Sequence, residues 1–570
     1  MIRSRRLVAA LTAALFSPAL AYAAWLPDGN PLAVTPDYEF SPNLVTDGQG
    51  GVLVSWVHYG TAGGVRVIGL DAKGNVQPKW PSDGLILPEL AGEEDPFMVS
   101  DDSGGAFLTA TAPTSVGFTH LSPLTSEIVR HDAAAMGAGR SAPQAKDAAT
   151  MHEGLILSVA APDGLGGAFV AFIDNERFYD THLVRHYAAD RSFTEVPLGA
   201  LTGCGTYYCP FGPLTLCSDG AGGAFVAWSQ DCGIRILRLT PQLTIAPGWP
   251  TTGVPAQACP ISSAYVGMCP DGAGGAYVVW QGYPTGSHPI RIARFTRSGT
   301  LAAGWSESGL LLSPHPTMPG AQRPYHGAFC SVVPDGSGGA LVAWTDERSD
   351  AGDIYLQRVL AGGALAPGWA VSGVAVGVAP GRQQNPMLTS DGTGGALVVW
   401  QDEQQDPDFA IRAAHVDAVG RVEPTTNTGG AIVSQGPGLR IFPRIASDGG
   451  QGAFIAWVDY RDGNGDIYAT RVLAPTIAVE PPINALRLDG IWPNPSRGSI
   501  TCRVTSNHGE GIDLELIDLA GRVWVRRHVG SGIGPHELTI TAPAAAGSGL
   551  FFVRVKRPGE VRVSRISIVK

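Results

Sequence analysis

Several features that would assign a class to this 570-residue chain are missing. No long amphipathic helical pattern appears after residue 23, so the sequence does not predict a helical protein. Beyond the N-terminal segment, no stretch is long and apolar enough to span a bilayer as a helix. The formal net charge is −11, which argues against nucleic acid as a partner because phosphate binding needs a basic surface.

Familiar catalytic motifs are also missing. The chain has no Gly-rich phosphate loop, no nucleophile elbow and no His-Glu-x-x-His sequence. Its eight cysteines show no Cys-x-x-Cys spacing and have no His pair nearby, which argues against a zinc site. The sequence therefore offers no cofactor or nucleophile from which to derive a reaction.

Glycine is abundant, at 75 residues, and much of it lies in one repeated stretch. The clearest copy, residues 219–228, reads Asp-Gly-Ala-Gly-Gly-Ala-Phe-Val-Ala-Trp. Glycine adopts positive φ at no steric cost, and an Asp carboxylate accepts hydrogen bonds from nearby backbone N–H groups, so each copy predicts a tight turn followed by a buried strand. Near-copies begin at Asp47, Asp163, Asp271, Asp335, Asp391 and Asp448, and a degenerate copy begins at Asp101.

Two further elements recur in each period. One is a strand such as residues 353–359, Asp-Ile-Tyr-Leu-Gln-Arg-Val, which is echoed at residues 466–472. The other is Trp-x-x-x-Gly followed by an apolar run, as at Trp80, Trp249, Trp305 and Trp369. Four short strands in each period of roughly fifty residues are typical of a β-propeller blade.

The eighth unit ends at its third strand, near Val472, with no Trp-x-x-x-Gly element after it. That element occurs at the other end of the chain, as residues 25–34. We therefore predict an all-β fold: an eight-bladed β-propeller over residues 24–474, with an N-terminal strand closing the last blade. The repeat region is similar to uncharacterised bacterial surface proteins, a likeness that implies no activity.

Residues 1–23 have the parts of a secretory signal: three early arginines, an apolar run and a small-x-small cleavage site. A secreted chain favours disulfides, and six of the eight cysteines lie in the fourth and fifth units. Local pairs are expected, with metal binding as the competing interpretation, although the sequence does not fix the connectivity. The plausible pairs are Cys204–Cys209, Cys217–Cys232 and Cys259–Cys269, whereas Cys330 and Cys502 are expected to be free and buried.

After Val472 the composition changes, with a Pro-containing linker at residues 475–485 and a different pattern over residues 486–570. Residues 491–495, Ile-Trp-Pro-Asn-Pro, precede residues 514–523, Leu-Glu-Leu-Ile-Asp-Leu-Ala-Gly-Arg-Val, and residues 549–555, Gly-Leu-Phe-Phe-Val-Arg-Val. Together they resemble the C-terminal sorting domain of type IX secretion substrates and the related FlgD-type Ig-like domain. The resemblance implies a β-sandwich of about seven strands, recognition by the secretion machinery, and release from or attachment to the cell surface. A plain Ig-like domain without a sorting role is the alternative.

One loop has the spacing of a cation site. Asp462, Asn464 and Asp466 place three oxygen-bearing side chains at alternate positions, as calcium loops do, but the distal Glu of a complete loop is missing. An ordinary turn between two strands is the alternative. Calcium is the only cofactor that the sequence suggests.

Acidic residues follow the Trp-ended strands in several units and raise the question of glycosidase chemistry, which uses a carboxylate pair. Because they recur at one position, we expect them to be structural and to pair with residues such as Arg348 and Arg461. They are Asp174, Asp346, Glu347, Asp402, Glu403 and Asp459. The Trp residues that end these strands are expected in the core between blades, and His182 and His186 at the surface.

These patterns predict a secreted or cell-surface protein that binds an extracellular glycan or protein through loops on one propeller face. Poorly patterned stretches such as residues 113–146 are expected to form long loops that could carry the binding surface. The alternative function is a polysaccharide-active hydrolase. A cluster of non-repeating acids, Arg or Tyr in the central channel would favour the enzyme.

Overall fold

The computed structural model folds the chain into two compact units, Met1–Ala474 and Pro475–Lys570. It describes residues 25, 28–60, 63–87, 94–101, 103–112, 115–121, 128–131, 156–174, 181–189, 192–197, 214–230, 233–257, 262–283, 289–314, 330–349, 352–405, 408–423, 429–436, 438–450, 452–473, 487–492, 496–506, 511–518, 522–529, 534–557 and 560–569. Within these ranges the regular secondary structure is β-strand, which confirms the all-β prediction, and no described helix has the length and hydrophobicity to cross a membrane.

The described part of the first unit contains eight antiparallel sheets, here numbered 1 to 8. Sheet 1 contains β2 (Tyr38–Thr46), β3 (Val52–Tyr59), β4 (Gly64–Leu70) and β5 (Leu85–Leu87). Sheet 2 contains β6 (Glu94–Ser100), β7 (Ala106–Ala112), β8 (Ser115–Leu121) and β9 (Ile128–His131). Sheet 3 contains β10 (Ile156–Pro162), β11 (Ala168–Asp174), β12 (Thr181–Tyr187) and β13 (Phe193–Pro197). Sheet 4 contains β14 (Thr215–Ser218), β15 (Ala224–Gln230), β16 (Gly233–Leu239) and β17 (Val254–Gln257).

The remaining sheets follow the same plan. Sheet 5 contains β18 (Ser262–Pro270), β19 (Ala276–Tyr283), β20 (Ile290–Phe295) and β21 (Leu310–Ser313). Sheet 6 contains β22 (Cys330–Pro334), β23 (Ala340–Asp346), β24 (Asp353–Val359) and β25 (Val374–Gly377). Sheet 7 contains β26 (Arg382–Ser390), β27 (Ala396–Gln405), β28 (Asp408–Val416), β29 (Val422–Glu423) and β30 (Ala431–Ser434), which also pairs with β28. Sheet 8 contains β31 (Arg440–Ser447), β32 (Gly452–Asp459), β33 (Asp466–Leu473) and β1 (Asn30–Ala33).

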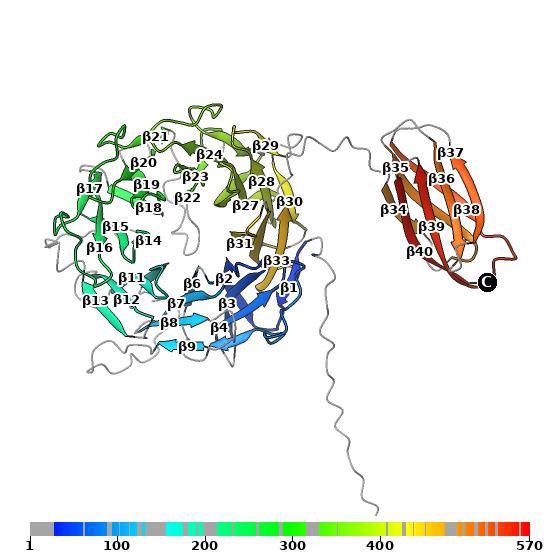
Figure 1. Cartoon of the computed structure of the whole chain (residues 1–570), viewed down its shortest axis with the longest axis horizontal. Coiled ribbons are helices and arrows are strands. Elements are labelled where there is room, and N and C mark those ends of the chain that lie inside the picture. The colour runs from blue at the N-terminus through cyan, green and yellow to red at the C-terminus, as the bar shows by residue number, and fades with distance from the viewer. Residues whose placement is uncertain are drawn as a thin grey trace, which may run out of the picture. The chain divides into compact units, whose positions relative to one another are not determined.

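The eight sheets follow one another around a ring (Figure 1). The first strand of each sheet contacts the first strand of the next, and β31 of sheet 8 contacts β2 of sheet 1. Strand β1 joins sheet 8 by antiparallel pairing with β33, in a register that sets Asn30 opposite Ala469 and Ala33 opposite Ile467. This pairing confirms the prediction that the N-terminal strand completes the last sheet.

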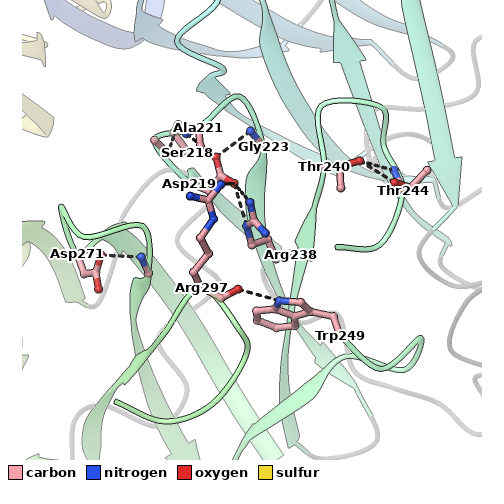
Figure 2. Close-up of polar contacts among 12 residues, drawn as sticks. Ser218, Asp219, Ala221, Gly223, Arg238, Thr240, Thr244, Trp249, Asp271 and Arg297 are labelled. Carbon is pink, nitrogen blue, oxygen red and sulfur yellow. Dashed lines mark hydrogen bonds and ion pairs between the residues drawn. The ribbon is translucent and has the colours of Figure 1, made fainter. Parts of the chain in front are cut away.

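The repeated Asp-Gly turn has the predicted chemistry. Oδ1 of Asp219 accepts hydrogen bonds from the N–H groups of Ala221 and Gly223, both at 2.8 Å, while Oδ2 pairs with Arg238 (Figure 2). A Cβ on Gly223 would lie 2.4 Å from the carbonyl oxygen of Leu239, so a side chain cannot be placed there. The third Gly of the motif is therefore required by close backbone approach.

Neighbouring sheets are also joined by the Trp of Trp-x-x-x-Gly. Nε1 of Trp249, in sheet 4, donates to the carbonyl oxygen of Arg297 in sheet 5 at 3.1 Å (Figure 2). Nε1 of Trp25 makes the same kind of bond to the carbonyl oxygen of Ala72 in sheet 1, at 3.0 Å. Trp25 thus performs for sheet 8 the role that Trp249 performs for sheet 4.

The Trp residues that end the second strands are core residues, as predicted, because their rings are almost completely buried. A Cβ on Gly309, for example, would lie 2.5 Å from the ring of Trp280, so the Gly of the fourth strand covers the Trp of its own sheet. The six are Trp56, Trp228, Trp280, Trp344, Trp400 and Trp457.

Two sequence predictions need correction here. The stretch 113–146 is not loop throughout, because β8 and β9 lie within it and complete sheet 2; residues 132–146 are outside the described ranges. The apolar alternation at residues 115–121 provides the strand that the weak repeat signal concealed.

The other correction concerns the disulfides. Cys217 and Cys269 are free and buried, as Cys330 and Cys502 are, whereas Cys204, Cys209, Cys232 and Cys259 lie outside the described residues. Cys217, on β14, sits opposite Phe225 and packs in the apolar core of sheet 4. Cys269 lies opposite Tyr277 near the end of β18 and is likewise buried. Both thiols are therefore held in apolar packing and not in a disulfide.

The second unit contains seven strands within its described residues, arranged in two antiparallel sheets. Buried Ile500, Leu514 and Val553 belong to a single apolar core. One sheet contains β34 (Arg487–Trp492), β35 (Ser499–Ser506) and β38 (Gly534–Thr541); the other contains β37 (Val523–Val529), β36 (Ile512–Asp518), β39 (Gly549–Arg557) and β40 (Glu560–Ile568).

Candidate functional site at the seam between sheets 1 and 8

The seam where the ring closes brings together polar residues from the two ends of the propeller sequence. The N–H of Glu39, on β2, donates to the carbonyl oxygen of Gly465 at 2.7 Å. Nδ2 of Asn464 donates to the carbonyl oxygens of Thr35 at 2.6 Å and Asp37 at 2.7 Å. The turn before β33 therefore holds the segment that links β1 to β2.

Two carboxylates lie buried in this seam. Oε1 of Glu39 accepts a hydrogen bond from the hydroxyl of Thr35 at 2.8 Å and lies 2.8 Å from Nδ1 of His58. Oε2 of Glu39 and Oδ2 of Asp466 are buried and have no hydrogen-bond partner within the described part of the chain. Both side chains are 0% exposed. Buried charges are normally paired, so two unmatched carboxylate oxygens in one seam indicate a missing positive partner.

The electrostatics agree with this geometry. Burial raises the pKa of Asp466, and the neighbouring Glu39 carboxylate raises it further, so that the pKa reaches about 6. Asp462 and Asp459 act in the same direction, against a hydrogen bond from the backbone of Thr35. The seam thus favours any ligand that reduces its negative charge, whether a proton or a cation.

The three residues of the predicted calcium loop lie in different environments in the structure. Asp462 is exposed in the turn, Asn464 uses its amide N–H groups on the carbonyls of Thr35 and Asp37, and Asp466 is buried at the start of β33. No group of three His, Cys, Asp or Glu side chains gathers with metal-binding geometry among the described residues. Calcium binding by these residues stays a prediction.

Sequence reasoning missed Glu39. It lies at the opposite end of the propeller sequence from Asp466, and no local motif marks it. The available signal was the predicted pairing of the N-terminal strand with residues 466–472, which brings the segment before β2 against the last sheet.

Two of the recurring acids, Asp346 and Asp459, have the structural pairing with Arg that the sequence predicted. Oδ2 of Asp346 accepts from Nε1 of Trp344 at 2.9 Å and from Arg348 at 2.6 Å. Asp459 is bound in the same way, by Nε1 of Trp457 at 2.9 Å and by Arg461 at 2.5 Å. These bonds tie each acid to the Trp of its own strand and to the Arg two residues later.

The other members of this set are less alike. Asp402 pairs with Arg412 and accepts from Nε2 of Gln383 at 2.9 Å. Glu347 and Glu403 are partly buried, and the side chain of Asp174 is outside the described set. Burial raises the pKa of Glu347.

The prediction of surface histidines is wrong for His186. It is buried, and its Nε2 lies 2.8 Å from Oδ2 of Asp163 in sheet 3. The equivalent contact in sheet 4 is the one between Arg238 and Asp219. The reason is positional equivalence, because in sheets 2 to 8 the third strand provides a His or Arg partner for the Asp of the turn, whereas in sheet 1 Gln77 contacts Asp47 instead. His182 is on β12, but its side chain is not among those described.

The two faces of the ring differ. Asp-Gly turns of neighbouring sheets touch one another on one face, since a Cβ on Gly336 would lie 3.1 Å from the carbonyl oxygen of Gly392. At the opposite ends of the strands, Tyr38 and Tyr59 are paired across β2 and β3. These two tyrosines are 54% and 46% exposed.

No protein-family model matches the chain, and no curated protein does. Among solved structures, one match is PorZ, an essential bacterial surface component of the type-IX secretion system of Porphyromonas gingivalis, with 12% identity and a TM-score of 0.26 over 93% of this chain and 75% of that one. Another is the β-propeller domain of the Trilobed protease from Pyrococcus furiosus, with 8% identity and a TM-score of 0.34 over 77% and 97% of the two chains.

A third match is a glycoside hydrolase family 43 arabinoxylan arabinofuranohydrolase from Bacillus subtilis, with 12% identity and a TM-score of 0.26 over 96% of each chain. At these identities and TM-scores the matches assign neither a family nor an activity to this chain.

Proposed function

We propose that this protein is a secreted or cell-surface eight-bladed β-propeller that binds an extracellular glycan or protein without catalysing a reaction. Its C-terminal unit is an Ig-like sandwich that presents the chain to the secretion machinery. The observation that supports the binding role most directly is the difference between the two faces of the ring. Asp-Gly turns of neighbouring sheets touch one another on one face, whereas the other face carries the exposed rings of Tyr38 and Tyr59.

Tyr38 and Tyr59 mark the proposed binding surface. They are cross-strand neighbours, each about half exposed, and the side chain of Asp37 beside them is partly exposed. Tyrosine rings stack on sugars or pack against peptide side chains, while their hydroxyls and a nearby carboxylate provide hydrogen bonds. This combination suits a neutral or basic ligand rather than an acidic one, in keeping with the chain's net charge of −11.

The test uses the chain from residue 24 onward on a glycan array and an extracellular-protein array, with a hydrolase screen in parallel. The double variant Y38A/Y59A should lose at least tenfold in affinity for any ligand found. L165S is the matched control, because Leu165 is 68% exposed on the opposite, Asp-Gly-turn face. Equal loss in both variants would argue against this binding surface, and release of sugar products would argue for the hydrolase.

The export role rests on the motifs at residues 491–495 and 514–523 and on the seven-stranded form of the second unit. A reporter fused to residues 475–570 should reach the cell surface or medium in a host with a type IX system, while the unfused reporter stays in the periplasm. A fusion that also stays in the periplasm would leave the unit as a plain Ig-like domain.

A further inference from the structure

We propose that a divalent cation of the calcium type binds between Glu39 and Asp466 and joins the two ends of the propeller sequence across the closing seam. The site would be formed only when the ring is closed, since one carboxylate belongs to sheet 1 and the other to sheet 8. This inference concerns the integrity of the ring and does not depend on the proposed ligand-binding face.

The main ligands of the proposed cation are the two carboxylates that have an oxygen without a hydrogen-bond partner among the described residues. Glu39 and Asp466 are both fully buried, and Oε2 of the first and Oδ2 of the second lack a partner within the described residues. The 2.7 Å hydrogen bond from the N–H of Glu39 to the carbonyl oxygen of Gly465 fixes the backbones of the two acids beside each other. A hard cation placed between them would replace the water that each carboxylate gives up on burial.

Additional oxygen donors are present around this pair. The carbonyl oxygens of Thr35 and Asp37 converge on the side chain of Asn464, and each has a second lone pair for another partner. Asp462 lies in the exposed turn two residues before Asn464 and adds negative charge on the solvent side of the pair without being a ligand of the cation. Ca²⁺ accepts this mixture of carboxylate, carbonyl and water oxygens. Such a site needs only two buried acids, which is consistent with the lack of a three-residue His, Cys, Asp or Glu cluster among the described residues.

The charge balance favours a divalent ion over a single proton. Four carboxylates, those of Asp37, Glu39, Asp462 and Asp466, surround the seam. His58 contacts Glu39 at 2.8 Å and Asp37 at 3.6 Å. A single proton would cancel one of these charges, whereas a divalent cation cancels both buried ones.

The nearby cation Arg461 and the remaining acid, Asp459, are already paired with each other, at 2.5 Å, so they do not alter this balance. Burial raises the pKa of Tyr468, on β33; Arg461 lowers this pKa and the surrounding acids raise it, with a net increase. Tyr468 therefore adds no negative charge at neutral pH.

The seam between sheets 6 and 7 gives an internal comparison. There the N–H of Gln383 donates to the carbonyl oxygen of Gly352 at 2.7 Å, just as Glu39 does to Gly465. Asp353 occupies the place of Asp466 at this seam, but the residue in the place of Glu39 is Gln383, which has an amide and no charge. The Nε2 of Gln383 donates a hydrogen bond to Asp402. The pair of carboxylates is therefore not repeated at this seam, which sets the closing seam apart from the repeated structural acids.

Calorimetric titration of the EDTA-treated chain from residue 24 onward with Ca²⁺ tests the site, together with thermal unfolding with and without Ca²⁺. We expect one equivalent of Ca²⁺ to bind and to raise the unfolding temperature by several degrees. E39Q and D466N should each lose both effects, and the matched control D353N should keep them. If both variants fail to fold, terbium luminescence sensitised by the nearby Tyr460 and competed by Ca²⁺ tests the site in the unaltered chain.

Three results would overturn the proposal. One is Ca²⁺ binding in E39Q equal to that of the unaltered chain. The second is loss of binding in D353N as great as in E39Q, which would place the ion elsewhere. The third is the absence of any Ca²⁺ effect combined with an unfolding temperature that falls as the pH rises through about 6, in a manner that E39Q abolishes. That result would mean that the two acids share a proton.

Discussion

Replacing Gly29 with Ala should open the ring at its closing strand. Gly29 precedes β1 with φ +85°, and a Cβ there would lie 2.3 Å from Cη2 of Trp457. The left-handed backbone conformation costs an L-residue about 1–2 kcal/mol, and forcing a methyl group against a packed indole costs about 1–3 kcal/mol more. The expected cost is therefore about 2–5 kcal/mol, which corresponds to an increase of about 30-fold to a few thousand-fold in the population with β1 detached.

Gly220→Ala is the matched control. Gly220 has φ +68° in the Asp-Gly turn of sheet 4, but nothing lies within 4 Å of its added Cβ. This substitution should lower the free energy of unfolding only by the cost of the left-handed backbone conformation, about 1–2 kcal/mol, and should not affect β1.

Hydrogen exchange read by mass spectrometry distinguishes the two variants. G29A should accelerate exchange in the peptide that contains β33, whose outer edge pairs with β1, and G220A should not. Unchanged exchange of β33 in G29A, or equal acceleration in both variants, would refute the packing argument.

Three further predictions follow from other parts of the molecule. Deleting residues 25–34 should lower the unfolding temperature of the propeller and expose the edge of β33 to proteolysis, and an unfolding temperature equal to that of the intact chain would contradict closure by β1. Burial alone would raise the pKa of Glu515, but hydrogen bonds from Lys556, Arg554 and Arg526 outweigh it and hold the pKa at about 2. The second unit should therefore lose stability as the pH falls from about 4.5 towards 2, and E515Q should flatten that dependence in pH-resolved thermal scans; an unchanged slope would refute this origin. Cys217 should react with a thiol reagent only after denaturation, and a disulfide-linked peptide containing it would contradict its free, buried state.

The ring of four-stranded sheets was predictable because its determinants are local and repeated. The Asp219 carboxylate bonds to N–H groups within four residues, and Gly223 meets a carbonyl oxygen of the adjacent strand, so each turn is encoded in one short stretch. The closing strand was predictable from an incomplete eighth unit and a spare Trp-x-x-x-Gly at residue 25.

The seam was predictable only in part. Asp466 attracted notice through its loop spacing, but its charged neighbour Glu39 is brought to it by ring closure, which no local pattern records. His186 was misjudged because a His replaces the Arg of other repeats as the partner of the turn Asp. Cys217 was misjudged because its place on one arm of a hairpin was taken for a disulfide position, whereas the structure packs its free thiol among apolar side chains.

Closure of the ring by the N-terminal strand is tested most directly by cross-linking β1 to β33. Pro31 is opposite Tyr468 in the antiparallel register, so P31C/Y468C should form a disulfide within one chain, found as a linked peptide by mass spectrometry without reduction. P31C/V472C, four positions along β33 and thus about 13 Å away, should not form one. A linked peptide in the second variant and not the first, or links only between chains, would contradict the closed ring.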